Sequence, residues 1–185
     1  MAHIPTAATG EIALLTFAEA MRKYGEGEKN YDTARWLYVP DFYTEYRYIL
    51  GTKGKNPLIA VGINPSTAAP DDLDNTLKSV ERIALANGYD SFIMFNVYAQ
   101  RATDPKHMEK TFNETLHREN MAAFEYILSL SERPAVWAAC NVLKGDVKVS
   151  AFPFRTHYVP RQPYYDQWKA VCQTGRHEWM NHYLK

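Results

Sequence analysis

Two apolar runs flanking an amphipathic segment constrain the fold of this chain more than any other feature. Residues 58–63 and 91–97 lack the polar alternation of half-exposed strands, as expected for central parallel strands covered on both faces. Between them, residues 75–87 carry apolar side chains at helical spacing, and Gly88 follows at a typical C-cap position. This order predicts a right-handed βαβ crossover.

Downstream, a second helix and a further strand continue the same pattern. Thr111 and Glu114 have capping-box spacing and open a predicted helix that runs to Leu130. Residues 135–140 form a third apolar run, and residues 155–159 are a candidate fourth strand. We therefore expect a three-layer α/β/α fold with a central, mainly parallel sheet of about four strands.

Upstream, the pattern predicts an N-terminal helix and a small β-hairpin. Residues 11–23 place apolar side chains at helical spacing, and residues 35–39 and 43–50 are rich in aromatic and β-branched residues. The 185 residues, 46% of them hydrophobic, are enough for one substantial core, and no repeat or linker divides the chain. We expect a single α/β domain over residues 1–185.

Charge and cysteine content exclude several classes of protein. The 21 basic and 21 acidic residues cancel, so the whole molecule has no general attraction for a phosphate backbone or an anionic membrane. The two cysteines, Cys140 and Cys172, form no multi-ligand pattern, and we expect no metal and no cofactor. No signal peptide and no apolar stretch of about 20 residues is present, which indicates a cytoplasmic protein without a membrane partner.

Polar residues follow the first apolar strand, where ligands bind in open α/β sheets. Beyond Gly62, Asn64 offers an amide that can orient a water molecule or read a ligand edge, and Pro65 stiffens the turn. Ser66 and Thr67 add hydroxyl groups and backbone donors suited to phosphate or carboxylate. An ordinary Asn-Pro-Ser-Thr turn explains the same residues equally well.

An acidic loop follows this turn and contains Asp71, Asp72 and Asp74. These carboxylates can bind a metal or act as bases, and we keep Asp74 as a candidate catalytic residue. The favoured interpretation is structural: a solvated loop and the N-cap of the next helix.

The loop after the second strand, residues 96–105, gathers an amide, a phenol, a guanidinium and a carboxylate. Asn96 can pair bidentately with a base or amide edge, and Arg101 is the natural anion clamp because its planar fork matches phosphate or carboxylate. Tyr98 and Asp104 are further candidate binding residues. The alternative is a buried Arg101–Asp104 ion pair that only shapes the loop.

A late histidine can complete the site, and both His157 and His177 lie where the remaining loops should fall. There is no nucleophile elbow, Walker loop or Rossmann glycine pattern.

Three motifs, Tyr-Arg-Tyr at residues 46–48, Val-Gly-Ile-Asn-Pro-Ser-Thr-Ala at 61–68 and the loop at 96–105, resemble the bacterial and phage family called domain of unknown function 1643. The resemblance spans about residues 43–140, and residues 174–178 match the family's late histidine segment in shortened form, which implies a role for His177. The first motif also resembles the Gly-Ile-Asn-Pro segment of mismatch-type uracil-DNA glycosylases, which are three-layer α/β proteins. That resemblance implies that Asn64 positions the attacking water and that Asn96 contacts the base.

Three functions follow as hypotheses. The first is a glycosylase-like hydrolase acting on a nucleobase in a nucleotide or nucleic acid. The second is a non-catalytic module that binds a nucleotide or another anion. The third and least favoured is an interaction protein with an exposed aromatic face formed by Trp36, Tyr38, Tyr43, Tyr46 and Tyr48.

Overall fold

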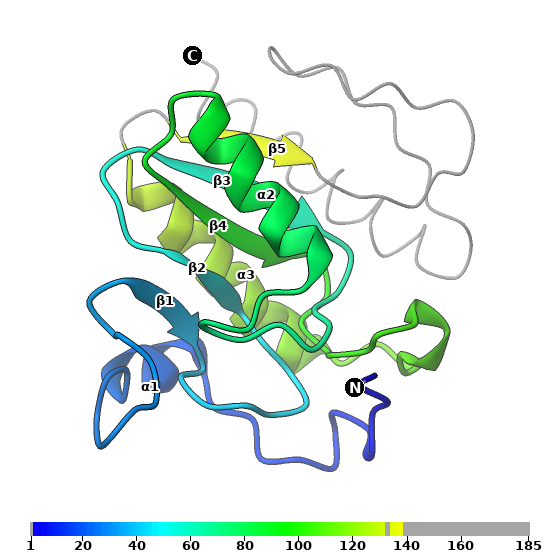
Figure 1. The fold of residues 1–185 in the computed structure, drawn as a ribbon. Coiled ribbons are helices and arrows are strands. Elements are labelled where there is room, and N and C mark those ends of the chain that lie inside the picture. The colour runs from blue at the N-terminus through cyan, green and yellow to red at the C-terminus, as the bar shows by residue number, and fades with distance from the viewer. Residues whose placement is uncertain (1, 132–133, 139–185) are drawn as a thin grey trace, which may run out of the picture. The chain divides into compact units, whose positions relative to one another are not determined.

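The computed structural model describes residues 2–131 and 134–138, which form a mixed five-stranded sheet with helices on both faces (Figure 1). The strand order is β1-β2-β4-β3-β5. The strands are β1 Trp36–Val39, β2 Ile49–Thr52, β3 Pro57–Gly62, β4 Ser91–Asn96 and β5 Ala135–Ala138.

The predicted βαβ unit is confirmed at the centre of this sheet. β3 pairs in parallel with β4 on one side and with β5 on the other. Helix α2, Asn75–Ala86, connects β3 to β4 and lies over one face of the sheet (Figure 1). The side chain of Asp74 caps its start, and Gly88 follows its end with φ +83°. The core under α2 contains Leu58, Ala60, Leu77, Val80, Ala84, Phe92 and Met94.

Helix α3, Glu114–Ser129, lies over the opposite face, where the ring of Phe124 stacks on Phe95 of β4 at 4.5 Å. Its N-cap is Asn113, whose Oδ1 accepts from the Leu116 N–H at 3.0 Å, so the predicted start at Thr111 is wrong. Asn113 also donates through Nδ2 to Thr9 Oγ1 at 3.0 Å. The sequence around residues 111–114 cannot predict this contact, because Thr9 is distant along the chain.

The expectation of a mainly parallel sheet is not confirmed, because the predicted hairpin joins the sheet. β1 pairs with β2, and β2 pairs with β4, both antiparallel, so two of the four pairings are antiparallel. Gly51 permits the β2–β4 contact: a Cβ there would lie 2.3 Å from the carbonyl oxygen of Phe92. Only glycine fits this close approach of two backbones.

The N-terminal helix is shorter than predicted: α1 covers only Phe17–Arg22 and starts with a capping box between Thr16 and Glu19. The preceding Leu15 has its backbone groups occupied by tertiary contacts. Its N–H donates to the Tyr46 hydroxyl at 2.8 Å, and its carbonyl accepts from the Tyr48 hydroxyl at 2.7 Å. These hydrogen bonds replace the helical ones that the apolar spacing predicts.

Two further predictions lie outside the described residues: the strand at residues 155–159 and the two cysteines. Within the described part of the chain, no helix is long and apolar enough to cross a membrane.

Buried tyrosines make the fold sensitive to alkaline pH. Burial raises the pKa of Tyr24 to about 12, and it also raises the pKa of Tyr48 and Tyr98. An unfolded phenol ionises near pH 10, so stability is complete below that pH and is lost as the pH rises from 10 towards 12. We expect the urea concentration at the midpoint of unfolding to decrease as the pH is raised from 9 to 11, which is about one unit either side of the ordinary phenol pKa.

The buried arginines affect the pH dependence of stability in the opposite direction from the tyrosines. Burial lowers the pKa of Arg47 to about 9, which adds stability over part of the same range. Seven described tyrosines have a raised pKa against two arginines with a lowered one, so the tyrosines decide the sign. A urea midpoint that increases over this pH range would show that the tyrosines are not the controlling groups.

Candidate functional site

Three loop segments meet at the carboxyl ends of β3 and β4. The parallel ladder continues past the strands, since the Val97 N–H donates to the Gly62 carbonyl at 2.9 Å. The Ala102 N–H then donates to the Pro65 carbonyl at 2.9 Å, and the Arg101 N–H donates to the Glu45 carbonyl at 2.8 Å. The two predicted motifs are therefore adjacent. We call Gly62, Asn64, Ser66, Thr67, Asn96 and Thr103 the strand-end site.

The carboxamide of Asn96 is the most unusual group in this site. Asn96 is 1% exposed, and neither its Nδ2 nor its Oδ1 has a hydrogen-bond partner within the described chain. Leaving such a group unpaired costs about 1–3 kcal/mol. The amide lies directly over Gly62, where an added Cβ would be 2.8 Å from Oδ1.

Asn120 of α3 holds the end of β4 in place and was missed by sequence reasoning. Its buried Nδ2 donates to the carbonyl of Asn96 at 2.8 Å and to that of Val97 at 3.2 Å. The available signal was a polar residue on the buried face of an amphipathic helix, one turn after Leu116 and one turn before Ala123. That signal indicates a buried amide but not its partner.

Asn64 is fixed by the neighbouring loop. Its Nδ2 donates to the Ala102 carbonyl at 2.7 Å and to the Pro65 carbonyl at 3.1 Å. No residue of the described ranges donates to its Oδ1, which remains an acceptor for water or a ligand. Ser66 Oγ lies 3.1 Å from Thr103 Oγ1, and Thr67 is half-buried beside them.

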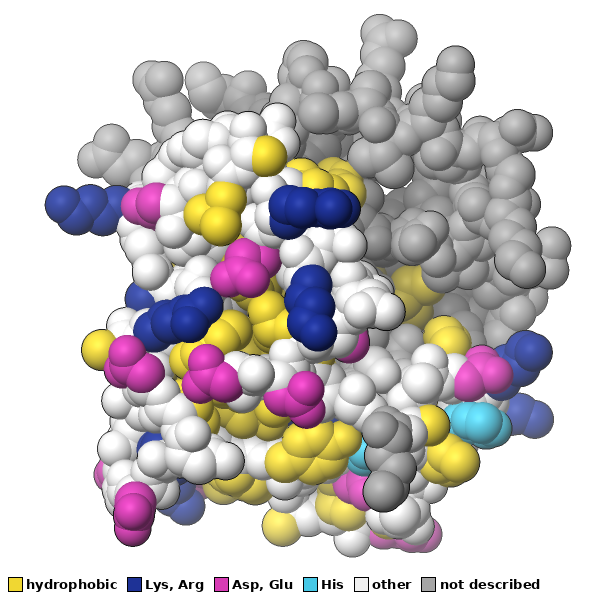
Figure 2. Space-filling view, viewed as in Figure 1, with side chains coloured by type: hydrophobic (Ala, Val, Ile, Leu, Met, Phe, Trp, Pro, Cys, Tyr) yellow, Lys and Arg dark blue, Asp and Glu magenta, His cyan; other side chains and the backbone are white. Residues whose placement is uncertain are grey.

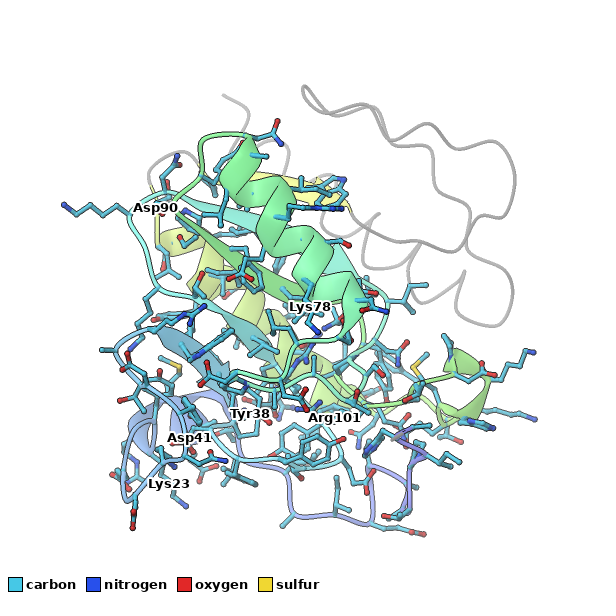
Figure 3. The ribbon with its side chains drawn as sticks, in the orientation of Figure 1. Lys23, Tyr38, Asp41, Lys78, Asp90 and Arg101 are labelled. Atoms are coloured by element: carbon cyan, nitrogen blue, oxygen red, sulfur yellow. The ribbon has the colours of Figure 1, made fainter. Side chains whose placement is uncertain are left out.

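Two buried arginines hold the loop between Ser66 and Ala68. Arg101, 0% exposed, donates through Nη1 to both carbonyls and through Nη2 to the Tyr38 hydroxyl at 2.9 Å. Arg47, 1% exposed, donates through Nη1 to the Ala68 carbonyl at 2.9 Å. Figure 3 places Arg101 and Tyr38 together, at the end of the sheet opposite Asp90. Arg101 therefore shapes the site through its backbone contacts.

Neither arginine forms an ion pair with a described acid, so the alternative of an Arg101–Asp104 pair is wrong. Burial lowers the pKa of both guanidinium groups, and repulsion by Arg101 lowers that of Arg47 further. The ring of Tyr43 covers Arg101, with its centroid 4.3 Å from Cζ. The two buried cations contribute a positive potential at the strand ends, which the carboxylates of Asp74, acting on Arg47, and Glu45, acting on Arg101, partly offset.

The acidic residues of the two loops have structural contacts. Asp74 Oδ1 accepts from the Leu77 N–H at 2.9 Å and caps α2, and Asp71 Oδ1 accepts from Trp36 Nε1 at 3.0 Å. Asp104 caps the 3₁₀-helix η1, Pro105–His107. No group of three or more potential metal ligands occurs in the part of the chain that the structure describes.

Of the remaining candidates, Tyr98 belongs to the strand-end site only through its backbone, whose N–H donates to the Ile63 carbonyl at 2.9 Å. The hydroxyl of Tyr98 donates to Glu109 and accepts from the Asn113 N–H, near the start of α3. His157 and His177 lie outside the described residues.

The predicted exposed aromatic face is wrong, because only Tyr43, at 51% exposure, is exposed. The other four aromatic residues are buried: Trp36, Tyr38, Tyr46 and Tyr48.

Comparison with known proteins gives one match. A family model described as "Protein of unknown function (DUF1643)" matches residues 47–151, more than half of the chain, and includes both strand-end motifs. No curated protein and no solved structure matches.

Proposed function

Because this chain belongs to the DUF1643 family of proteins of unknown function, its activity has to be argued from its own residues, and we propose that it binds a nucleobase at the strand-end site. The base is free or part of a nucleotide or nucleic acid. One observation carries this proposal: the carboxamide of Asn96 is buried beside Gly62 and has no hydrogen-bond partner among the described residues.

A carboxamide presents a donor and an acceptor side by side, which complements the edge of adenine or the amide edge of uracil and hypoxanthine. A base paired with Asn96 would satisfy both unpaired atoms at once. The space over Gly62 is filled by the side chains of Met94 and Asn96, since an added Cβ there would meet Met94 Cε and would lie 2.8 Å from Asn96 Oδ1. Since Asn96 is 1% exposed, binding requires the groups that cover it to move.

The surroundings favour a small anionic ligand over a long nucleic acid. The hydroxyl groups of Ser66, Thr67 and Thr103 and the positive potential of the buried arginines suit a phosphate group. On the face drawn in Figure 2, basic and acidic side chains are interspersed, without an extended basic surface. A nucleoside or nucleotide in the cytoplasm is therefore the ligand that we favour.

A melting-temperature screen against nucleobases, nucleosides and nucleotides tests this proposal. A ligand present at 100 times its Kd should stabilise the wild-type protein by about 2.7 kcal/mol. The Asn96→Ala variant should lose this gain, whereas Asn30→Ala, at an exposed asparagine, should keep it. The proposal fails if no ligand stabilises the wild type, or if the best ligand stabilises Asn96→Ala equally.

A second candidate function is hydrolysis of the N-glycosidic bond, as the likeness of the first motif to uracil-DNA glycosylases suggests. It rests on Asn64, whose Nδ2 is tied to two carbonyls so that Oδ1 is a fixed acceptor for water. The water oxygen would attack the sugar carbon, and the bonding electron pair would leave with the base. Asp74 could take the water's proton only through its second oxygen, because Oδ1 caps α2.

Oligonucleotides and nucleosides containing uracil or hypoxanthine distinguish hydrolysis from binding alone. Wild-type protein should release the free base, and Asn64→Ala should be slower by about 100-fold because the water is no longer held in place. Asn30→Ala serves again as the control. Absence of released base at high protein concentration would leave the non-catalytic binding module.

A further inference from the structure

A second cluster of polar side chains lies beside the strand-end site. His3 Nε2 lies 3.0 Å from Glu45 Oε2, and His3 Nδ1 lies 3.0 Å from the hydroxyl oxygen of Tyr43. Thr6 Oγ1 donates to the other carboxylate oxygen of Glu45 at 2.6 Å. The His3 and Glu45 side chains are 10% and 18% exposed, whereas Tyr43 is 51% exposed. The aromatic hydroxyl is thus accessible, and the two groups behind it are covered.

This arrangement has the geometry of an activated nucleophile. In the tautomer that carries its proton on Nε2, His3 donates to the carboxylate of Glu45, and its Nδ1 lone pair accepts the O–H of Tyr43. A nucleophile, a base within hydrogen-bond reach and a third group that orients the base are the parts required for covalent catalysis.

Hydrogen bonds fix the cluster next to the strand-end site. The His3 N–H donates to Thr103 Oγ1 at 2.7 Å, and the Thr103 N–H donates to the His3 carbonyl at 2.9 Å. The ring of Tyr43 lies over Arg101, and no described acid pairs with Arg101 or Arg47. A positive charge beneath the ring stabilises a developing phenolate and attracts anionic reactants.

We propose that Tyr43 is a reactive hydroxyl, activated by His3 and Glu45, that attacks negatively charged electrophiles of the phosphoryl type. In this step the Tyr43 oxygen forms a bond to phosphorus while the bond from phosphorus to the leaving group breaks. The electron pair of that bond leaves with the leaving group, and the phenol proton moves to His3 Nδ1. The step does not require nucleobase binding by Asn96.

Aryl sulfonyl fluorides test this reactivity directly. Attack forms a bond between the tyrosine oxygen and sulfur, and the sulfur–fluorine bond breaks to release fluoride. Because Tyr43 is exposed and Tyr38, Tyr46 and Tyr48 are buried, the reference is N-acetyltyrosine amide free in solution. We expect para-fluorosulfonylbenzoate to modify Tyr43 faster than this free tyrosine by a factor on the order of 100, as read by peptide mass spectrometry. The neutral methyl ester of the same reagent should react more slowly. A rate for Tyr43 no higher than that of the free tyrosine overturns the proposal, and an ester that reacts as fast as the anion overturns its preference for anionic groups.

Variants separate activation from simple docking of the N-terminal segment. His3→Gln keeps a hydrogen-bonding side chain but removes the base, so labelling of Tyr43 should fall to the rate of free N-acetyltyrosine amide while the melting temperature stays near that of the wild type. His107→Gln, at an exposed histidine, should label normally. Wild-type labelling in a folded His3→Gln protein overturns the proposal. If His3→Gln does not fold, Glu45→Gln replaces it: labelling of Tyr43 should fall in that variant, and labelling at the wild-type rate overturns the proposal.

Discussion

Replacing Arg101 by alanine is expected to lower the free energy of unfolding by about 3 kcal/mol, because two acceptors lose their donor and a buried side chain is removed. The Ser66 carbonyl and the Tyr38 hydroxyl lose the hydrogen bonds that Arg101 gives them, while Ala68 keeps the one from Arg47. The substitution also leaves a cavity at a fully buried position. Relief of the repulsion with Arg47 offsets part of this loss, but it restores none of the broken contacts.

Urea unfolding of three variants measures this effect. Arg101→Lys keeps the charge but lacks the planar fork, so it should recover only part of the lost stability. Arg82→Ala, at an exposed arginine on α2, should change stability by less than about 0.5 kcal/mol. Equal stability of Arg101→Ala and Arg82→Ala would refute the view that Arg101 holds the loop between Ser66 and Ala68.

Replacing Asn96 by alanine should have the opposite effect on the unliganded protein. Its carboxamide has no hydrogen-bond partner within the described residues, and removing two unpaired atoms should leave the free energy of unfolding unchanged or raise it by up to about 2 kcal/mol. Ligand affinity should fall by about 10- to 100-fold, since a bidentate pair with a base contributes about 1–3 kcal/mol. A group that lowers stability and is needed for binding is the expected signature of a functional side chain.

Asn120→Ala is the comparison, because Asn120 is equally buried and its Nδ2 is paired, although its Oδ1 has no partner among the described residues. This variant should lose about 1–3 kcal/mol, since the carbonyls of Asn96 and Val97 lose their donor. Chemical unfolding of both variants measures their stability, and ligand titration measures their affinity. If Asn96→Ala is destabilised as much as Asn120→Ala, the Asn96 amide is part of the structural core.

The centre of the fold could be predicted because its signals are local. The apolar runs of β3 and β4 and the amphipathic spacing of α2 determine a parallel unit, and parallel strands end at the same edge. That geometry brings the loops that follow Gly62 and Asn96 together. The pairing of β2 with β4 depends on a contact between distant segments, which no local pattern in the sequence predicts, although Gly51 is what permits the close approach.

The site was predicted less completely, for physical reasons. Arg101 was expected to face a ligand, yet its side-chain hydrogen bonds within the described residues go to two backbone carbonyls and to Tyr38. Arg47 was recognised as part of the Tyr-Arg-Tyr motif, but its burial was not predicted, because the sequence alone does not distinguish a buried arginine from an exposed one. The contact of His3 with Glu45 joins segments about forty residues apart, and no local pattern encodes it.

A heteronuclear NMR titration that follows side-chain amide groups reads the Asn96 carboxamide directly. Addition of the nucleoside or nucleotide that most raises the melting temperature should shift the Asn96 NH₂ resonances more than those of Asn30 or Asn120. Saturation with that ligand while the Asn96 NH₂ resonances stay in place would contradict recognition of the base by Asn96.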